Sequence, residues 1–417
     1  MELKKYRLKE IATIWNGATP SSAHPEYYDG DIVWLTPKDL SDQKSKYIFH
    51  GERMITNKGF NSCSTHLLPE GTILMSSRAP IGLLAISGCE CCTNQGFKNI
   101  VTDYRYCDTE YLFYYLKFNM KRIVGLGSGT TFLEISKSSL ENFEIELPSL
   151  PVQQRISHVL SSIDRKIALN REINRNLEAM ARQLYDYWFV QFDFPDENGR
   201  PYKSSGGKMV WNEKLKREIP EGWEDGKLID ISNITMGQSP DGSTYNEKGE
   251  GIIFYQGSTD FGLRFPSVRQ FTSSPTRFAK QGDILMSVRA PVGTTNIANK
   301  DCCIGRGLAA LNSKIGSITH LYHIIQDLKA AFDMRNDAGT TFGSITKDDL
   351  CSLSILRPAA SIVTLYEKLC SPIFAKQMLI GENIDILTKQ RDELLPLLMN
   401  GQILVMPKEV NCDLSHD

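Results

Sequence analysis

Two long segments of the chain carry a heptad pattern of apolar residues. The first, residues 152–189, contains no Gly and no Pro. Its two seam positions hold Ile156, Ile163, Asn170, Leu177 and Leu184, and then Leu160, Ile167, Asn174, Ala181 and Trp188. The second, residues 362–399, places Ile362, Tyr366, Leu369, Ile373, Ile380, Ile384, Leu387, Leu394 and Leu398 in the same way. This pattern predicts two long helices that bury their stripes against each other in an antiparallel coiled coil.

Polar or helix-weakening residues interrupt both stripes. Asn170 and Asn174 lie in the first seam, where a buried amide weakens packing but fixes register and pairing. Pro372 predicts a kink near Ser371, and Gly381 is a second weak point in the same helix. A helix of about 38 residues would be about 57 Å long, because each residue adds about 1.5 Å.

The rest of the chain is an internal repeat. The segment GTILMSSRAPIG at 71–82 returns 211 residues later as GDILMSVRAPVG at 282–293. The Cys-Cys pair at 91–92 returns at 302–303, GTTF at 129–132 returns at 339–342, and residues 11–20 match 231–240. Collinear matches of this kind indicate a duplication. Residues 27–69 and 245–280 share almost nothing, and a common scaffold with divergent loops is typical of binding proteins.

Each copy combines helix and strand patterns. The repeated GTILMSS and GDILMSV segments predict a core strand that enters a Pro-Gly turn. Residues 110–123 have helical spacing, and residues 143–147 alternate as a short strand that ends at Pro148. The predicted fold is therefore α+β, with two repeated mixed α/β domains joined by two long antiparallel coiled-coil helices.

These patterns divide the chain into six segments. The predicted boundaries are a first α/β domain at 1–149, a long helix at 150–192, a polar, Gly-rich linker at 193–222, a second α/β domain at 223–356, a second long helix at 357–403 and a flexible tail at 404–417. An aromatic run closes the first helix and contains Tyr185, Tyr187, Trp188, Phe189, Phe192 and Phe194. Such a run suits a docking surface for a partner protein or a core against the second domain equally well.

Composition limits the classes of function. Hydrophobic residues make up 41% and charged residues 23%, the balance of a soluble globular protein. No stretch approaches the roughly 20 apolar residues that a membrane helix needs, and the start has no apolar signal segment, so the expected location is cytoplasmic. The net charge of −2 argues against a protein that binds DNA alone, unless partners supply phosphate contacts.

Motifs for chemistry are missing or weak. The chain has neither a Walker P-loop nor the Asn-Pro-Pro-Tyr type of motif used in amino methylation. GLGSG at 125–129 resembles a cofactor-binding loop, but the segment before it is helical rather than a strand. Cys63, His66, Cys89 and Cys92 have metal-ligand spacing, but Cys63, His66 and Cys89 have no counterpart in the second copy. Buried thiols are therefore the preferred interpretation, and no metal site is predicted.

Several motifs, in this order, resemble one family. They are WLTPKDL at 34–40, the two strand-turn segments, GSGTTFLEIS at 127–136 with DAGTTFGSIT at 337–346, MARQLYDYWFVQFDFP at 180–195 and LTKQRDELLPLLMNGQI at 387–403. Together they resemble the specificity (S) subunit of type I restriction-modification enzymes over residues 1–405.

The resemblance implies a non-catalytic DNA-binding subunit. Each α/β domain would be a target-recognition domain that recognises one half of a split, asymmetric site in double-stranded DNA, and the helices would set the unread spacer. Two modification subunits would methylate adenine with S-adenosylmethionine. Restriction subunits would use ATP and Mg to translocate and cut DNA, so no cofactor is expected on this chain itself.

Residues that differ between the copies are the candidates for base recognition, because two different half-sites need different contacts. They are Lys38, Asp39, Lys44, Lys46, Asn94, Gln95 and Lys98 in the first copy, and Gln256, Ser258, Arg264, Arg269 and Arg306 in the second. Arg and Lys suit guanine, and Asn and Gln suit adenine. Residues shared by both copies suit phosphate contact or scaffold instead; these are Arg78, Arg289, Thr130, Thr131, Thr340 and Thr341.

Two other functions fit the sequence less well. One is a DNA-modifying enzyme, such as a nuclease with an unrecognised active site, although no cluster of chemical residues recurs in both copies. The other is a coiled-coil scaffold whose duplicated domains bind other proteins. Methyl transfer or DNA cleavage by the purified chain alone would favour the enzyme.

Overall fold

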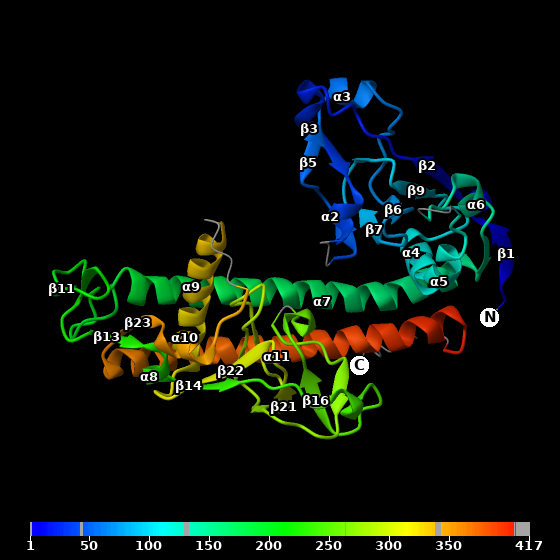
Figure 1. Ribbon diagram of the computed structural model, residues 1–417. Coiled ribbons are helices and arrows are strands. Elements are labelled where there is room, and N and C mark those ends of the chain that lie inside the picture. Colours follow the sequence, from blue (N-terminus) through cyan, green and yellow to red (C-terminus); the bar gives the residue numbers. More distant parts are fainter. Residues whose placement is uncertain are drawn as a thin grey trace, which may run out of the picture. The chain divides into compact units, whose positions relative to one another are not determined.

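The computed structural model describes residues 2–41, 45–128, 133–262, 264–337, 343–403 and 405, with side chains left out at 330, 331 and 333–337. The chain forms two compact units. Unit 1 contains residues 1–169 and 385–417, and unit 2 contains residues 170–384. Each unit holds one mixed α/β domain together with part of both long helices (Figure 1). This is the α+β architecture predicted from the repeat and the heptads.

Domain 1 (residues 4–147) lies in unit 1. Its elements are β1 Lys4–Arg7, α1 Leu8–Ile11, β2 Ala12–Asn16, the 3-10 turn Pro25–Tyr27, β3 Tyr28–Leu35, α2 Pro37–Ser41, β4 Tyr47–Ile48, β5 Arg53–Ile55, α3 Asn57–Asn61, β6 Ile73–Ser76, β7 Leu84–Ser87, β8 Cys92–Thr93, β9 Phe97–Thr102, α4 Thr109–Phe118, α5 Met120–Val124, α6 Lys137–Glu141 and β10 Glu144–Leu147. The main sheet has the order β2-β9-β6-β7-β4, a second sheet has the order β5-β3-β8, and β1 pairs with β10.

Domain 2 (residues 224–357) lies in unit 2. Its elements are β13 Glu224–Lys227, α8 Leu228–Ile231, β14 Ser232–Met236, the 3-10 turn Gly242–Thr244, β15 Tyr245–Asn246, β16 Ile252–Tyr255, the 3-10 turn Ser258–Asp260, β17 Gln270–Thr272, β18 Phe278–Ala279, β19 Ile284–Ser287, β20 Thr295–Ile297, β21 Cys302–Ile304, β22 Leu308–Ser313, α9 Ile318–Asp337, α10 Lys347–Ser352 and β23 Ser354–Arg357. The main sheet has the order β14-β22-β19-β20, a second sheet has the order β15-β17-β16-β21-β18, and β13 pairs with β23.

The repeated strand is central to the main sheet in both domains. Ile73 of β6 pairs with Ile100 and Ile86, and Ile284 of β19 pairs with Leu311 and Ile297. The partners are thus separated by the same 211 residues as the repeat itself. All four residues of each strand are buried, as expected for a central strand whose Ile, Leu and Met side chains are apolar on both faces. The shared register confirms that the chain is a duplication.

The two long helices lie side by side (Figure 1). The first is α7, Leu150–Tyr185, which continues into a π-helical turn at Asp186–Val190, and the second is α11, Ala360–Met399. In unit 2, Glu178 accepts a hydrogen bond from Gln377, and in the π-helical turn after α7 the Trp188 ring contacts Tyr366. Residue numbers in the first helix increase from one contact to the next while those in α11 decrease, so the two helices are antiparallel. α11 is a single helix from end to end, with Pro372 inside it.

Most seam residues lie against other parts of the protein. Ile156, Leu160, Ile167, Asn174, Ala181, Trp188, Tyr366, Ile380, Ile384 and Leu398 are buried, and Ile163, Asn170, Leu177, Leu184, Ile362, Ile373, Leu387 and Leu394 are half-buried. Leu369 is the exception, because 47% of it is exposed. Both side-chain polar atoms of Asn174 are buried without a hydrogen-bond partner among the described residues. Asn174 is thus a buried polar interruption of the seam, and its role in fixing register stays a prediction.

The segment predicted as a linker is folded. Residues 193–222 include a hairpin of β11 Met209–Asn212 and β12 Arg217–Pro220. Phe194 stacks on Tyr202 and Trp223 with ring centroids 4.7 and 4.9 Å apart. The aromatic run next to it is core, since Tyr185, Trp188, Phe189, Phe192 and Phe194 are at most 5% exposed in the cluster that also holds the apolar residues of domain 2. Tyr187 alone is exposed, at 37%.

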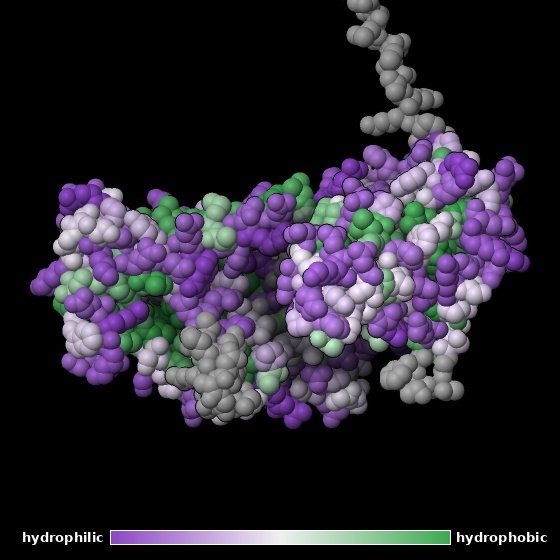
Figure 2. Space-filling model, turned by 90° about the horizontal axis from the view of Figure 1, so that it is seen from above, coloured by the Kyte–Doolittle hydropathy of each residue, from purple (hydrophilic) through white to green (hydrophobic). Residues whose placement is uncertain are grey.

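The face seen in Figure 2 is mainly hydrophilic, with separate apolar patches. No helix in the described ranges is long and apolar enough to cross a membrane.

Candidate nucleic-acid interface

Three loops meet beside the second sheet of each domain, and we call them the three-loop surface. In domain 1 the loops are residues 17–20, 36–39 and 94–96, and in domain 2 they are residues 237–240, 256–260 and 305–307. The first loop follows the edge strand of the main sheet, the second follows β3 or β16, and the third follows β8 or β21. Equivalent loops therefore leave equivalent strands.

The same backbone hydrogen bonds hold these loops together in both domains. In domain 1, the amide of Ala18 donates to the carbonyl of Thr93 at 2.9 Å, and the amide of Asn94 donates to Leu35 at 2.9 Å. In domain 2, Gln238 donates to Ile304 at 3.0 Å, and Gly305 donates to Tyr255 at 2.8 Å. The scaffold of the three-loop surface is thus duplicated together with the main sheet.

Glycine permits the close approach of the first and third loops. A Cβ atom on Gly17 would lie 2.0 Å from the carbonyl oxygen of Asn94, and one on Gly237 would lie 2.1 Å from that of Gly305. No side chain fits at either distance. These two glycines are the shared residues that begin the first loop, and the residues after them differ between the copies: Ala-Thr in domain 1 and Gln-Ser in domain 2.

An aspartate shapes the second loop in each domain. The amide of Thr36 donates to Asp39 at 2.7 Å, and the amide of Gln256 donates to Asp260 at 2.8 Å. The other carboxylate oxygen of Asp39 accepts the amide of Glu52 at 2.8 Å. Both oxygens of Asp39, which the sequence suggested for base recognition, are therefore used in local hydrogen bonds.

The side chains that decorate the shared scaffold differ in size and charge. In domain 1, Lys38 is 70% exposed and forms an ion pair with Glu52 at 2.7 Å, and Thr19 hydrogen-bonds to Gln95. Asn94 folds back, since its Oδ1 accepts the amide of Gly96 at 2.9 Å. In domain 2, the position of Gln95 is taken by exposed Arg306, whose amide donates to Ser239 at 3.2 Å.

The second loop of domain 2 adds further polar groups. Gln256 is exposed, and Ser258 is half-buried in its 3-10 turn. Arg269 lies beside this loop, where its Nε donates to Asp260 at 2.8 Å. The structure thus places Lys38, Asn94, Gln95, Gln256, Ser258, Arg269 and Arg306 at the two three-loop surfaces.

Three other candidates are buried instead. Lys98 is 5% exposed and forms an ion pair with Glu134 at 3.3 Å. Lys46 and Arg264 have side chains that are 6% and 8% exposed, and both contact the long helices. The sequence predicted these buried cations and the exposed ones alike as DNA contacts, because the burial of a side chain depends on tertiary contacts.

The shared arginines flank the strand-turn of each repeat. Arg78 is 39% exposed and lies 3.8 Å from Glu134, and Arg289 is exposed and its backbone bridges to Ser344. Each precedes a cis peptide bond, Ala79–Pro80 or Ala290–Pro291. Lys44, Thr130, Thr131, Thr340 and Thr341 lie outside the residues that the structure describes.

Sequence reasoning missed Thr19, Gln238 and Ser239 of the first loop. The available signal was the Gly-x-x-Pro motif at 17–20 and 237–240, in which a shared glycine and proline enclose two residues that differ.

The helix pair has an exposed apolar face in unit 2. Ile173 and Met180 of α7 and Tyr187 of the π-helical turn that follows it are spaced at intervals of seven and are 36%, 55% and 37% exposed. On α11, Leu365, Leu369 and Leu379 are 39%, 47% and 51% exposed. A surface helix normally keeps such positions polar, so this face suits contact with another helix.

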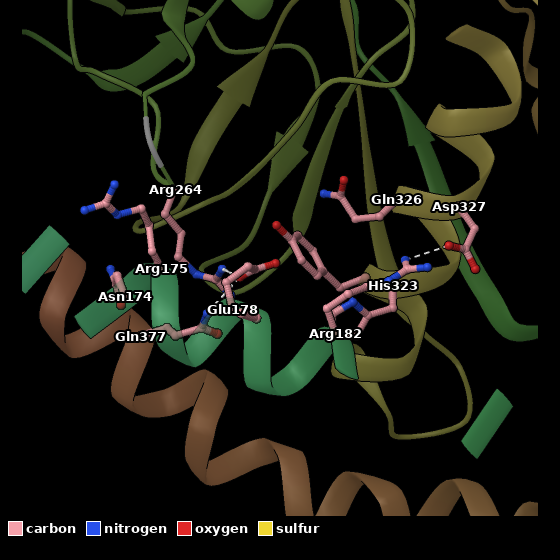
Figure 3. Close-up of a pocket in the computed structure, with 11 residues that line it drawn as sticks. Asn174, Arg175, Glu178, Arg182, Arg264, His323, Gln326, Asp327 and Gln377 are labelled. Carbon is pink, nitrogen blue, oxygen red and sulfur yellow. Dashed lines mark hydrogen bonds and ion pairs between the residues drawn. The ribbon is translucent and has the colours of Figure 1, made fainter. Parts of the chain in front are cut away.

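A cavity of about 630 Å³ opens in unit 2 where α7, α9, α11 and the Arg264 segment come together (Figure 3). Its walls carry charges of both signs, from Arg175, Arg182, Arg264, Glu178 and Asp327. Arg264 points toward Glu178 and Gln377 on one side, and Arg182 forms an ion pair with Asp327 at 2.6 Å on the other.

The cysteine-histidine group of domain 1 has ordinary packing contacts. The His66 ring lies 4.3 Å from the Trp15 ring, and Cys89 donates to the carbonyl of Phe49. Burial raises the pKa of the Cys91 thiol to about 12 and that of Cys92 to about 11, so both are protonated at neutral pH. No group of three or more potential metal ligands occurs among the described residues.

Comparison with known proteins gives one consistent result. The model of the type I restriction modification DNA specificity domain matches residues 1–179 and 220–393. The MjaIX specificity subunit of a type I restriction enzyme from Methanocaldococcus jannaschii is 32% identical, over 96% of this chain and 93% of that protein. The HindI specificity subunit from Haemophilus influenzae is 24% identical, over 70% of this chain and 77% of that protein. Among solved structures, the S subunit of a type I restriction-modification system from M. genitalium has the same fold, with a TM-score of 0.61 and 16% identity over 95% of this chain and 96% of that one.

Proposed function

This chain belongs to the type I restriction-modification DNA specificity family and acts as a sequence-specificity subunit, and we propose that each of its two α/β domains recognises one half of a bipartite, asymmetric DNA site. In this proposal domains 1 and 2 are the target-recognition domains, and the three-loop surface of each contacts its half-site.

The duplicated three-loop surface carries the proposal. Its backbone is held by the same hydrogen bonds in both domains, whereas its side chains differ. Such a surface would dock on DNA in the same way twice and recognise different bases each time. Gln95 in domain 1 and Arg306 in domain 2 occupy the same position, and an amide suits adenine while a guanidinium suits guanine.

We propose different roles in DNA contact for the variable and the shared residues. For base contact we propose the exposed or half-buried group at the two surfaces, which is Lys38, Asn94, Gln95, Gln256, Ser258, Arg269 and Arg306. For phosphate contact we propose Arg78 and Arg289, together with Thr130, Thr131, Thr340 and Thr341, because these residues are shared and cannot distinguish two half-sites. Lys46, Lys98, Arg264 and Asp39 are left out, because internal contacts occupy them.

The helix pair has two proposed tasks. Its length would set the number of unread base pairs between the half-sites. Its exposed apolar face, with Ile173, Met180 and Leu379, would dock the two modification subunits, and restriction subunits would join the same complex. Binding of DNA and S-adenosylmethionine by the partners would explain how a chain with a net charge of −2 acts on DNA. The complex would work in the cytoplasm.

A reconstitution experiment tests the function. The purified chain is mixed with its modification subunits, S-adenosylmethionine and a pool of random duplex oligonucleotides, and methylated adenines are located by sequencing. We expect methylation at one two-part motif with a constant spacer, and no methylation without the chain. Methyl transfer or cleavage by the chain alone, or methylation without a motif, would contradict the proposal.

A further inference from the structure

Lys46 and Arg264 occupy the same place in the two domains, although the sequence around them shows no similarity. The amide of Ile86 donates to the carbonyl of Lys46 at 2.9 Å, and the amide of Ile297 donates to the carbonyl of Arg264 at 2.8 Å. Ile86 and Ile297 are equivalent residues of the repeat, on β7 and β20. Each divergent region therefore places one cation against the same edge of the main sheet.

In unit 1 the ammonium group of Lys46 connects domain 1 to α7. It donates to Glu110 of α4 and to Ser161 of α7, each at 2.8 Å, and lies 5.2 Å from the centre of the Tyr114 ring. Burial would raise the pKa of Glu110, but hydrogen bonds from Lys46, Ser161 and Tyr47 lower it, so the carboxylate is ionised at neutral pH. The buried ammonium is thus fully compensated where the domain meets the helix.

In unit 2 Arg264 makes the corresponding connection (Figure 3). Its Nη1 donates to Glu178 of α7 at 2.6 Å, and the same carboxylate oxygen accepts a hydrogen bond from Gln377 of α11 at 2.8 Å. The guanidinium lies over the rings of Phe374 and Tyr322, at 4.9 and 5.3 Å from their centres. Its Nε and Nη2 have no hydrogen-bond partner within the described part of the chain, so its orientation depends on Glu178.

The contact between Arg264 and α7 borders a cavity, which sets it apart from the apolar core of domain 2. The two ion pairs Arg264–Glu178 and Arg182–Asp327 bridge α7 to the domain, and the hollow of about 630 Å³ lies between them. The aromatic cluster around Tyr185 and Trp188 anchors domain 2 at the C-terminal end of α7, whereas beside the hollow close packing is interrupted and the contact includes these charged groups. A charged hydrogen bond has strict geometry, so it can fix the angle at which the domain meets the helix.

We propose that Lys46 and Arg264 are positioning residues: each fixes its recognition domain on the helix pair, at Ser161 and Glu178 of α7, and together they set the spacer that the complex accepts. This proposal rests on the bipartite recognition proposed above. It assigns the two cations to the spacing of the half-sites rather than to the choice of bases. Both domains hold a cation at this one position although the surrounding loops differ in sequence, which fits a task common to both domains.

The test measures spacer tolerance in the complete complex with its modification subunits. A set of duplexes carries the two wild-type half-sites with the spacer changed by one base pair at a time. For Arg264→Met we expect the preference for the wild-type spacer over its neighbours to fall by about tenfold, the order of effect when a positioning contact is loosened, with the bases of both half-sites unchanged. Lys46→Met should act in the same direction.

Three variants separate positioning from general damage. Glu178→Gln removes the ionic partner but keeps Arg264 and should reproduce the effect of Arg264→Met, whereas Arg264→Lys, which can still reach Glu178, should restore part of the preference. Arg200→Met removes an arginine that is 61% exposed and pairs with Asp196, four residues away, and it should leave the spacer profile unchanged.

Each result has a defined meaning. If Glu178→Gln and Lys46→Met retain the wild-type spacer preference, the positioning role is wrong. Changed base preference at a half-site in Arg264→Met would also overturn it, because the arginine would then recognise bases. If the wild-type complex methylates no two-part motif at all, the proposed bipartite recognition is wrong, and the positioning role that rests on it is wrong too.

Discussion

Asp164 of α7 and Arg391 of α11 form an ion pair at 2.9 Å, and their side chains are only 14% and 17% exposed. The hydroxyl group of Tyr114 on α4 donates to the same aspartate. One carboxylate in unit 1 therefore joins both long helices and domain 1. Burial would lower the pKa of Arg391, but hydrogen bonds to Asp164 and Asp392 raise it, so the guanidinium stays protonated at any physiological pH.

Removing the cation should weaken unit 1. Arg391→Met leaves Asp164 buried without its ionic partner, and we expect a loss of about 2–3 kcal/mol in the free energy of unfolding, somewhat less than the cost of breaking a fully buried pair. Urea unfolding followed by circular dichroism would measure it. Lys389→Met is the matched control, because Lys389 is 76% exposed and pairs with Glu393 at 3.9 Å, so its loss should cost less than about 0.5 kcal/mol. Equal effects of the two variants would contradict the role of the pair.

Substitutions on the two three-loop surfaces should act on different half-sites. Arg306→Ala should relax base preference at one position of the half-site read by domain 2, with a loss of about 1–3 kcal/mol in discrimination. Gln95→Ala should do the same for the other half-site, because Gln95 takes the equivalent position in domain 1. Sequencing of methylated sites from a random pool gives both profiles.

Each of these variants serves as the control for the other. A uniform loss of methylation at all sequences in Arg306→Ala would assign that arginine to phosphate contact instead. A change in both half-sites after one substitution would contradict the one-domain, one-half-site division.

The duplication and the helix pair could be predicted from the sequence because both depend on periodic or repeated apolar residues. β6 and β19 are identical in pattern and are buried on both faces, so the core constraint is visible in the residues themselves. The heptads likewise identified Leu160 and Ile167, which are 0% and 2% exposed. The pattern of apolar residues was sufficient to predict burial wherever the burial of a residue follows from its place in one helix or strand.

The site was only partly predictable, because exposure of a polar residue depends on contacts between distant segments. Lys46 and Lys38 are both lysines of one divergent loop region, yet Lys46 meets Ser161, 115 residues away, and is buried, while Lys38 is 70% exposed. The linker prediction missed the packing of Phe194 on Trp223 for the same reason. Polar, Gly-rich composition around 196–208 concealed the aromatic residues that fold the segment.

Acid should destabilise unit 2 through two buried histidines. Burial lowers the pKa of His320, and burial followed by Arg182 lowers that of His323, each to about 3. Between that value and the ordinary histidine pKa of about 6.5, the unfolded chain binds a proton at each residue and the folded chain does not. Stability should therefore fall as the pH drops below about 6.5, by about 1.4 kcal/mol per pH unit for each histidine.

A variant isolates this effect from that of the carboxylates. His320→Phe keeps an aromatic ring among Tyr185, Phe189 and Tyr366 and removes one of the two protonation sites. The slope of unfolding free energy against pH should decrease by about 1.4 kcal/mol per unit between about pH 6 and about pH 4. Chemical unfolding at several pH values measures the slope. An unchanged slope would mean that His320 titrates normally in the folded protein.

The length of the helix pair should determine the spacer. The contacts Asp164–Arg391 and Glu178–Gln377 lie on either side of residue 170 in α7 and of residue 385 in α11. Seven residues inserted after Asn170, with seven inserted opposite them between Ile384 and Asp385, preserve the heptad seam and both contacts. The pair becomes about 10 Å longer at about 1.5 Å per residue, and this length corresponds to about three base pairs at about 3.4 Å each. Methylation of random duplexes should then reveal the same two half-sites with a spacer longer by about three base pairs.

An insertion in α7 alone shifts its seam against α11 and should reduce methylation at every spacer. If the doubly extended chain kept the wild-type spacer, the distance between half-sites would be set by the modification subunits or by the DNA, and not by these helices.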